Sequence, residues 1–192
     1  MGAELFAELP YETVSLEDVA DRAGVSRALM YHYFPNKRDF FAAIFQRASD
    51  KLLAADEPDG AKHVADLILD SLTTHIDYFV SHRHEALAVN TGPLSGDPLI
   101  QAIISEELGV VRQRMLDALG LDGHDRELAS TALRGWLAFA RAACTDWIER
   151  QTCSREELQA MCLGALAGAL RPQTWSLSSL EPLGGDGPGP AA

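Results

Sequence analysis

Apolar residues recur at three- and four-residue spacing along most of this chain, and no segment alternates apolar and polar residues as a strand does. Near the N-terminus the repeating positions are Leu16, Val19, Ala20 and Ala23. No internal sequence repeat appears. The pattern therefore predicts an all-α fold.

Glycine- and proline-containing breakers divide the rest of the chain at residues 56–60, 92–98, 120–123 and 152–154. The intervening segments predict helices over about 37–55, 61–82, 98–119, 126–150 and 154–170. Asp97 with Pro98 forms a cap and first-turn pair, and Ser154 with Glu157 forms a capping box. Arg112 and Arg114 are expected to be solvated. The Pro- and Gly-rich segment 172–192 predicts a flexible tail, in which Trp175 is able to dock back.

Two short helical stretches meet at Gly24 with the spacing of a helix-turn-helix. Ser15 is placed to cap the first helix, with Asp18 three residues later. A glycine at position 24 allows the left-handed conformation that turns the chain, and Ser26 is the next N-cap. We expect Val25, Met30 and Phe34 to close a small core beneath the second helix.

The second helix leaves an outward set of side chains suited to the major groove of DNA. Arginine pairs with guanine, small apolar groups contact the thymine methyl, and Tyr or His donates to base edges or phosphates. The set is Arg27, Ala28, Leu29, Tyr31 and His32. Tyr33 and Lys37 would lie beside the DNA backbone, and Asn36 caps a third helix whose N-terminus favours a phosphate. The alternative is a tight helical hairpin with its tyrosines packed inside.

The N-terminal quarter resembles the tetracycline repressor (TetR) family. The resemblance rests on residues 5–8 (LFAE), Tyr11-Glu12, 15–20 (SLEDVA), 23–27 (AGVSR) and 31–37 (YHYFPNK). It implies a dimeric regulator whose C-terminal helices bind a small molecule. It also implies base contacts from Arg27, Ala28, Leu29, Tyr31 and His32, phosphate contacts from Ser15, Tyr33 and Lys37, and a place for Ser26 in the DNA-binding set.

The chain departs from the family at two points. It begins inside the family's first helix, without the basic arm, and Pro10 stands where glycine is usual. A shorter first helix leaves Leu5, Phe6 and Leu9 as a thinner support for the recognition helix and removes phosphate contacts. Either the true start lies upstream or DNA binding is weakened.

Charge bears on the strength of DNA binding. The formal net charge is −12, and residues 1–50 contain five basic and eight acidic side chains, or −3 by subtraction. Charges beyond about 8 Å are screened at physiological salt, so Arg27, Lys37 and Arg38 dominate near the groove. We therefore expect low nonspecific affinity and reliance on direct readout.

Length and composition fit a small two-part helical protein, with 47% hydrophobic residues among 192. The expected division is 1–50 for the DNA-binding domain, 51–171 for the effector and dimerisation domain, and 172–192 for the tail. No apolar run of 18 residues and no secretory pattern appear, so a cytoplasmic protein is expected. Cys144, Cys153 and Cys162 lack the spacing of a disulfide framework or zinc site. We expect each to be a small buried or half-buried apolar residue, and the alternative is a redox-sensor role.

An enzyme is the alternative from another class. Six histidines prompt a search for a metal or acid–base site, and His82, His84, His63, His75 and His124 are its candidates. None has ligand spacing, and no catalytic motif accompanies them. No enzymatic activity, metal or cofactor is therefore expected. A second alternative is an interaction module that keeps the fold without DNA binding.

Two further sites are predicted in the C-terminal helices. Small residues at four-residue spacing allow close approach of another long helix, and we expect a homodimer that reads a palindromic operator; the alternative is an ordinary internal helix. The predicted interface residues are Trp147, Leu163, Gly164, Ala167 and Gly168. The predicted effector residues, each also compatible with plain core, are His75, Tyr78, Phe79, Met115, Trp136, Phe139 and Trp147. Arg134 and Arg141 are placed to pair with an acidic ligand, or with acids such as Asp146 or Glu149.

Overall fold

The computed structural model describes residues 4–55 and 64–170, and every regular element in these ranges is helical. The order is α1 (Glu4–Glu8), the 3-10 turn η1 (Tyr11–Thr13), α2 (Leu16–Ala23), α3 (Arg27–Tyr33), α4 (Lys37–Ala55), α5 (Val64–Ser81), α6 (Arg83–Asn90), α7 (Pro98–Leu119), α8 (Gly123–Arg150) and α9 (Arg155–Ala169). The predicted all-α class is confirmed. The tail predicted over 172–192, with Trp175, and His63 lie outside the described residues.

Capping side chains set the helix boundaries where the sequence predicts them. Ser15 and Asp18 form the reciprocal capping box of α2, and Gly24 ends that helix at φ 69°. The Ser26 hydroxyl accepts the Leu29 amide, and the Asn36 side chain accepts the Asp39 amide at the start of α4. Asp97 caps α7, and Ser154 caps α9. Each cap satisfies backbone N–H groups that have no partner inside the helix.

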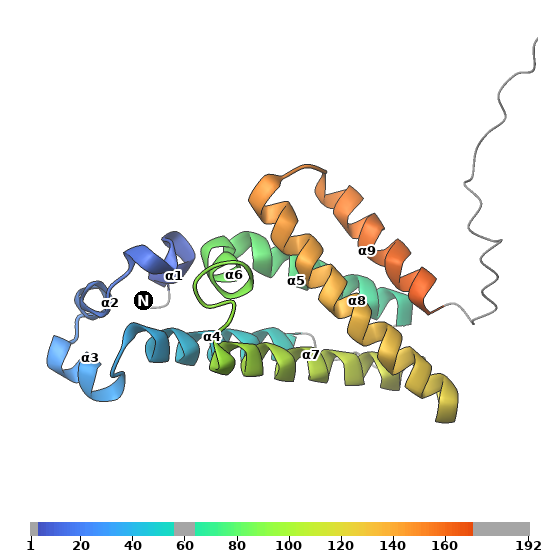
Figure 1. The fold of residues 1–192 in the computed structure, drawn as a ribbon, viewed down its shortest axis with the longest axis horizontal. Coiled ribbons are helices and arrows are strands. Elements are labelled where there is room, and N and C mark those ends of the chain that lie inside the picture. Colours follow the sequence, from blue (N-terminus) through green and yellow to red (C-terminus); the bar gives the residue numbers. More distant parts are fainter. Residues whose placement is uncertain (1–3, 56–63, 171–192) are drawn as a thin grey trace, which may run out of the picture.

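The short helices α1 to α3 form a head at one end of an elongated molecule (Figure 1). Helix α4 leaves the head and runs beside α7, while α8 and α9 form an antiparallel pair at the other end. Helix α5 packs against α7, α8 and α9. The long helix α4 therefore connects the head directly to the helices of the C-terminal part.

Two apolar cores lie along this length. The head core surrounds Phe6, Val19 and Phe41 and continues into α6 and α7 through Val89 and Ile100. The second core lies between α5, α7, α8 and α9. The predicted DNA-binding domain, residues 1–50, thus shares its core with helices that are distant in sequence.

Several sequence predictions are corrected by the packing. Val25 is 36% exposed and does not close the head core, whereas Met30 is buried and Phe34 packs against that core. Arg114 is half-buried and donates to the Leu53 carbonyl at 2.7 Å, so it is not simply solvated. Arg112 is likewise only partly exposed, and its Nε is buried.

Helix α6 was not predicted. The chain turns at His82, which has no glycine or proline beside it, and α6 then buries Glu85, Ala86, Ala88 and Val89. The Tyr78 hydroxyl donates to the Glu85 carboxylate at 2.8 Å across the turn. The break is thus fixed by tertiary contacts on both of its sides.

Candidate nucleic-acid interface and effector pocket

Helix α3 presents an exposed face built mainly of the residues predicted to read DNA. Met30 faces the head core and fixes the rotation of the helix. The remaining side chains are exposed, Tyr33 at 68% being the most open aromatic residue of the head; they are Arg27, Ala28, Leu29, Tyr31, His32 and Tyr33. Large exposed aromatic groups on a short capped helix are typical of a surface that meets a partner.

Ser15 and Ser26, both predicted at the DNA interface, act as helix caps in this structure. The Ser15 hydroxyl oxygen accepts the Asp18 amide at 3.1 Å, and Ser26 accepts the Leu29 amide at 3.2 Å. Both lie at helix N-termini that carry unpaired amides suited to a phosphate. Their phosphate contacts remain predictions.

Acidic side chains lie beside the exposed face of α3. Glu17 of α2 accepts the Tyr31 hydroxyl at 2.8 Å, and Asp21 lies 3.5 Å from the Arg27 guanidinium. The hydrogen bond from Tyr31 lowers the pKa of Glu17, so this carboxylate stays ionised. DNA phosphates that approach Arg27 or Tyr31 therefore compete with these two acids.

Lys37 is engaged within the protein. Its ammonium donates to the Tyr11 carbonyl at 2.8 Å and the Glu12 carbonyl at 3.3 Å, and it lies 4.3 Å from the centre of the Tyr11 ring. These contacts hold η1 against the first turn of α4. A lysine has three N–H donors, so one is left for the predicted phosphate contact.

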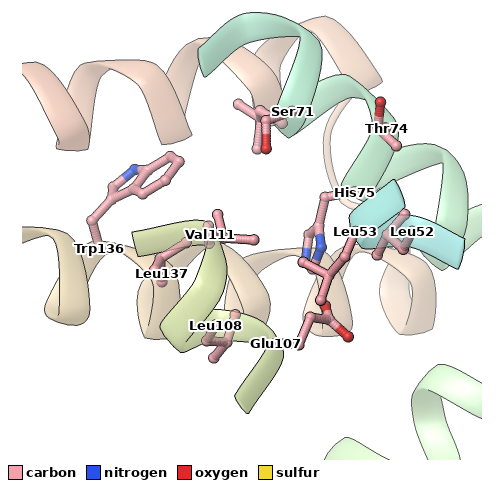
Figure 2. A pocket seen from close by; sticks show the side chains of 12 residues that line it. Leu52, Leu53, Ser71, Thr74, His75, Glu107, Leu108, Val111, Trp136 and Leu137 are labelled. Atoms are coloured by element: carbon pink, nitrogen blue, oxygen red, sulfur yellow. The ribbon is translucent and has the colours of Figure 1, made fainter. Parts of the chain in front are cut away.

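A pocket lies between α4, α5, α7 and α8 (Figure 2). Its cavity has a volume of about 40 Å³, and about 560 Å³ of space is free of protein atoms when the open mouth is included. Aliphatic side chains from all four helices, with Trp136 at one end, make most of its wall. The full lining is Leu52, Leu53, Ser71, Leu72, Thr74, His75, Glu107, Leu108, Val111, Trp136, Leu137 and Ala140. A largely apolar cavity with a few polar groups is typical of a small-molecule site.

His75 and Glu107 are the ionisable side chains of the wall, and Ser71 and Thr74 add two hydroxyl groups (Figure 2). Burial and the positive charge of Arg141 lower the pKa of His75 to about 3, so its imidazole is neutral at neutral pH. Burial raises the pKa of Glu107, whose side chain bonds to Ser49 of α4. Arg141 lies behind this wall, where its Nε donates to Asn90 at 2.7 Å. Its predicted pairing with Asp146 or Glu149 is therefore replaced by a contact to α6.

Only His75 and Trp136 of the seven predicted effector residues line this pocket. Phe79 and Met115 are buried in the second core, and Phe139 is 40% exposed. Tyr78 lines a separate groove between the head and α5–α6. Trp147 donates to the Cys153 carbonyl at 2.9 Å and does not line this pocket, so the two tryptophans do not share its wall. Helical periodicity gives the face of one helix but not the neighbours that enclose a space.

The pocket lining that the sequence analysis missed includes Leu52, Leu53, Ser71, Thr74 and Glu107. The signal available for Glu107 was a carboxylate on the apolar side of α7, where it is only 6% exposed. Leu52 and Leu53 carry no such signal, because leucines near the end of a helix are common in any core.

The predicted dimer surface lies on α8 and α9. Gly164 and Ala167 are exposed, and Trp147, Leu163 and Gly168 are half-buried. A Cβ atom added at Gly164 or Gly168 would meet no other atom within 4 Å, so the backbone there is open to close approach. Phe139 and Met161 add exposed apolar surface to the same two helices.

The cysteines match their prediction, since Cys144 and Cys162 are buried and Cys153 is half-buried. Within residues 4–55 and 64–170, no three His, Cys, Asp or Glu side chains gather as a metal site. No helix in the same ranges is long and apolar enough to cross a bilayer.

Residues 2–44 match the family described as bacterial regulatory proteins, tetR family. A 53-residue stretch, 28% of this chain and 24% of the relative, is 35% identical to the transcriptional activator FasR of Mycolicibacterium smegmatis. A tetR-family regulator from Streptomyces coelicolor has a similar structure, with a TM-score of 0.78 and 24% identity over 88% of this chain and 76% of that one. FadR of Bacillus subtilis in complex with stearoyl-CoA has a TM-score of 0.64 and 18% identity over 88% of this chain and 94% of that one. These likenesses establish the fold and the type of its N-terminal domain.

Proposed function

From the N-terminal domain and the all-helical fold that make this chain a member of the TetR family of transcriptional regulators, we propose that it binds an operator in duplex DNA and represses transcription until a small molecule releases it. One observation carries the proposal. The capped helix α3 keeps a continuous face of exposed polar and aromatic side chains, with its orientation fixed by the buried Met30. Such a face fits the major groove, where Arg27 would pair with a guanine edge. The protein would act in the cytoplasm.

A homodimer is part of the proposal. One seven-residue recognition helix reaches few base pairs, so tight discrimination requires two heads on a palindromic site. The open backbone at Gly164 and Gly168 supports contact of α8 and α9 with those of a second copy. Contact between the α8 and α9 helices of two copies would also bury apolar surface of the exposed Phe139 and Met161.

Effector release follows from the position of the pocket on α4. Leu52 and Leu53 of the pocket wall belong to the same helix whose first turn carries Lys37 in the head. A ligand that separates α4 from α7 would therefore shift the head through a continuous helix. The ligand would bind the shifted conformation more tightly than the DNA-binding one. The loss of operator affinity is limited by this difference in ligand affinity. The stearoyl-CoA complex of FadR supports ligand binding within this fold.

The test is selection of bound sequences from random duplex DNA with the purified full chain. We expect one enriched palindromic sequence. Arg27→Gln should weaken binding to it by about 5- to 150-fold, which corresponds to the cost of about 1–3 kcal/mol for a lost bidentate base contact. Arg150→Gln, which removes an equally exposed arginine paired with Asp146 on α8, is the matched control. Equal affinity for random and selected duplexes would overturn the proposal.

A second candidate is an interaction module without DNA binding. The pairing of Tyr31 with Glu17 and of Arg27 with Asp21 favours it, because both DNA-facing groups already have acidic partners. This candidate predicts that no sequence is enriched and that α3 variants keep the partner. The selection therefore separates the two functions.

A further inference from the structure

A second, more open groove lies between α7 and α8 and is marked by two arginines. Its lining is Ser105, Leu108, Gly109, Arg112, Arg134 and Leu137, with about 710 Å³ of space that includes its open mouth. No acidic side chain contributes to it. Cations on both walls and no anion between them favour a negatively charged occupant.

Neither arginine is neutralised within the part of the chain that the structure describes. No ion pair or hydrogen bond joins Arg112 or Arg134 to residues 4–55 or 64–170, and the Arg112 Nε is buried without an acceptor. Arg126 on the same helix α8, by contrast, pairs with Asp117 at 2.6 Å. Buried polar groups nearly always have partners, so the Arg112 Nε is a donor that this chain leaves unused. In a chain of net charge −12, an arginine pair without an acid is not explained by a shortage of carboxylates.

The groove adjoins the apolar pocket. Leu108 and Leu137 line both spaces, so the pocket and the groove adjoin at these two side chains. Arg112 follows Leu108 by one helical turn on α7, and Arg134 precedes Leu137 by about one turn on α8.

The apolar pocket cannot itself satisfy an anion. None of its twelve lining residues is Lys or Arg, and its one ionisable acid is the carboxyl of Glu107. A carboxylate or phosphate inside it would lose its hydration without touching a cation, because Arg141 lies behind the wall and already donates to Asn90. An anionic group on an apolar ligand is therefore better placed in the neighbouring groove.

We infer that the effector is an anionic amphiphile, with its apolar body in the pocket of Figure 2 and its carboxylate or phosphate held by Arg112 and Arg134. This inference rests on the proposed ligand role of the pocket and adds the class of ligand. Arginine binds carboxylate and phosphate in the same forked geometry, so both sources fit the groove.

The test measures binding of four ligands that share a dodecyl chain, each below its micelle concentration, to the full protein. The probes are dodecanoate, dodecyl phosphate, 1-dodecanol and dodecylamine. Calorimetry measures the affinity of each. Dodecanoate or dodecyl phosphate should bind at least about tenfold tighter than the alcohol, and the better of the two identifies the head group. Arg112→Gln with Arg134→Gln should lower the affinity for both anions to that of the alcohol and leave the alcohol unchanged. Arg150→Gln should match the wild type.

A second variant keeps both arginines and fills the groove. A side chain at Gly109 would enter open space, so Gly109→Leu should weaken the anions more than the alcohol, and it tests the inference if the double variant does not fold. Equal binding of alcohol and anions, tightest binding of the amine, or an equal loss for all probes in the variants would overturn it. The inference would also be overturned if the double variant changed the oligomeric state and left the affinity for every probe unchanged. That result would mean that the arginines pair with a second copy. Operator selection is a separate readout, so its failure would contradict the proposed function and not this ligand class.

Discussion

The Arg38 guanidinium binds both carboxylate oxygens of Asp97, with Nη2 donating to Oδ1 at 2.9 Å and Nε donating to Oδ2. Arg38 lies in the first turn of α4, and Asp97 is the N-cap of α7, where it accepts the Leu99 and Ile100 amides at 3.0 and 3.2 Å. One carboxylate thus joins the first turns of the two long helices that flank the pocket. The contact adds to the apolar core that the head shares with α6 and α7.

Replacement of Asp97 should separate its two roles. Asp97→Ala removes the cap and the ion pair and should lower the free energy of unfolding by about 1–2 kcal/mol, whereas Asp97→Asn keeps a capping oxygen and should cost less than about 1 kcal/mol. Arg38 and the capped amides lower the pKa of Asp97, so its contribution is present above the unfolded pKa and is lost as pH falls through the folded one. Urea unfolding should therefore show a weaker loss of stability at acidic pH in Asp97→Asn than in the wild type. An identical pH profile would contradict this role.

Removal of the Glu17 charge should strengthen DNA binding. Glu17→Gln takes a carboxylate away from the exposed face of α3 and releases Tyr31 from a charged acceptor. We expect affinity for random duplex DNA to rise by about two- to fivefold at low salt, with a smaller change at high salt, where screening weakens the repulsion. Fluorescence anisotropy over a salt series measures this effect. The control is Glu127→Gln, an exposed acid on α8 away from the head, and an equal gain there would assign the effect to net charge alone.

His75 should make stability depend on pH between about 3 and the unfolded value of about 6.5. The folded pKa is depressed, so in this window the unfolded chain binds the extra proton. Stability is then complete above the unfolded pKa and falls as pH decreases, by at most about 1.4 kcal/mol per pH unit. His75→Phe, which retains a ring against Phe79, should flatten the curve in chemical unfolding at pH 5 and pH 7. His124→Gln, at an exposed position of α8, should keep the wild-type slope, and a flattened curve there would refute the assignment.

Ala167 should tolerate no charge if α8 and α9 pair with a second copy. Ala167→Glu places a carboxylate on the exposed face of α9 that includes Gly164. A buried unpaired charge costs several kcal/mol, so sedimentation should show a dimer for the wild type and single chains for the variant. Ala102→Glu makes the same change at an exposed position of α7 and should remain dimeric. A variant that still dimerises would place the interface elsewhere.

Local signals made the head predictable. Ser15, Gly24, Ser26 and Asn36 act within four residues of their own positions, through caps and one left-handed turn, so their effects can be derived without any distant contact. The exposure of Arg27 and its neighbours followed from the same periodicity. Val25 was predicted wrongly because a residue next to a turn has no periodic pattern to fix its direction.

The sequence alone determined the helical class, the capped boundaries and the outward face of α3, because hydrogen bonds and periodicity over one or two turns specify them. Only the tertiary structure decided which residues enclose the pocket, since Leu53, His75, Glu107 and Trp136 come from four helices whose mutual rotation depends on packing. The turn at His82, the contact of Arg141 with Asn90 and the placement of Arg112 beside Arg134 have the same origin. The two arginine contacts join groups more than 20 residues apart in sequence. The turn at His82 has no glycine or proline beside it that could have predicted it.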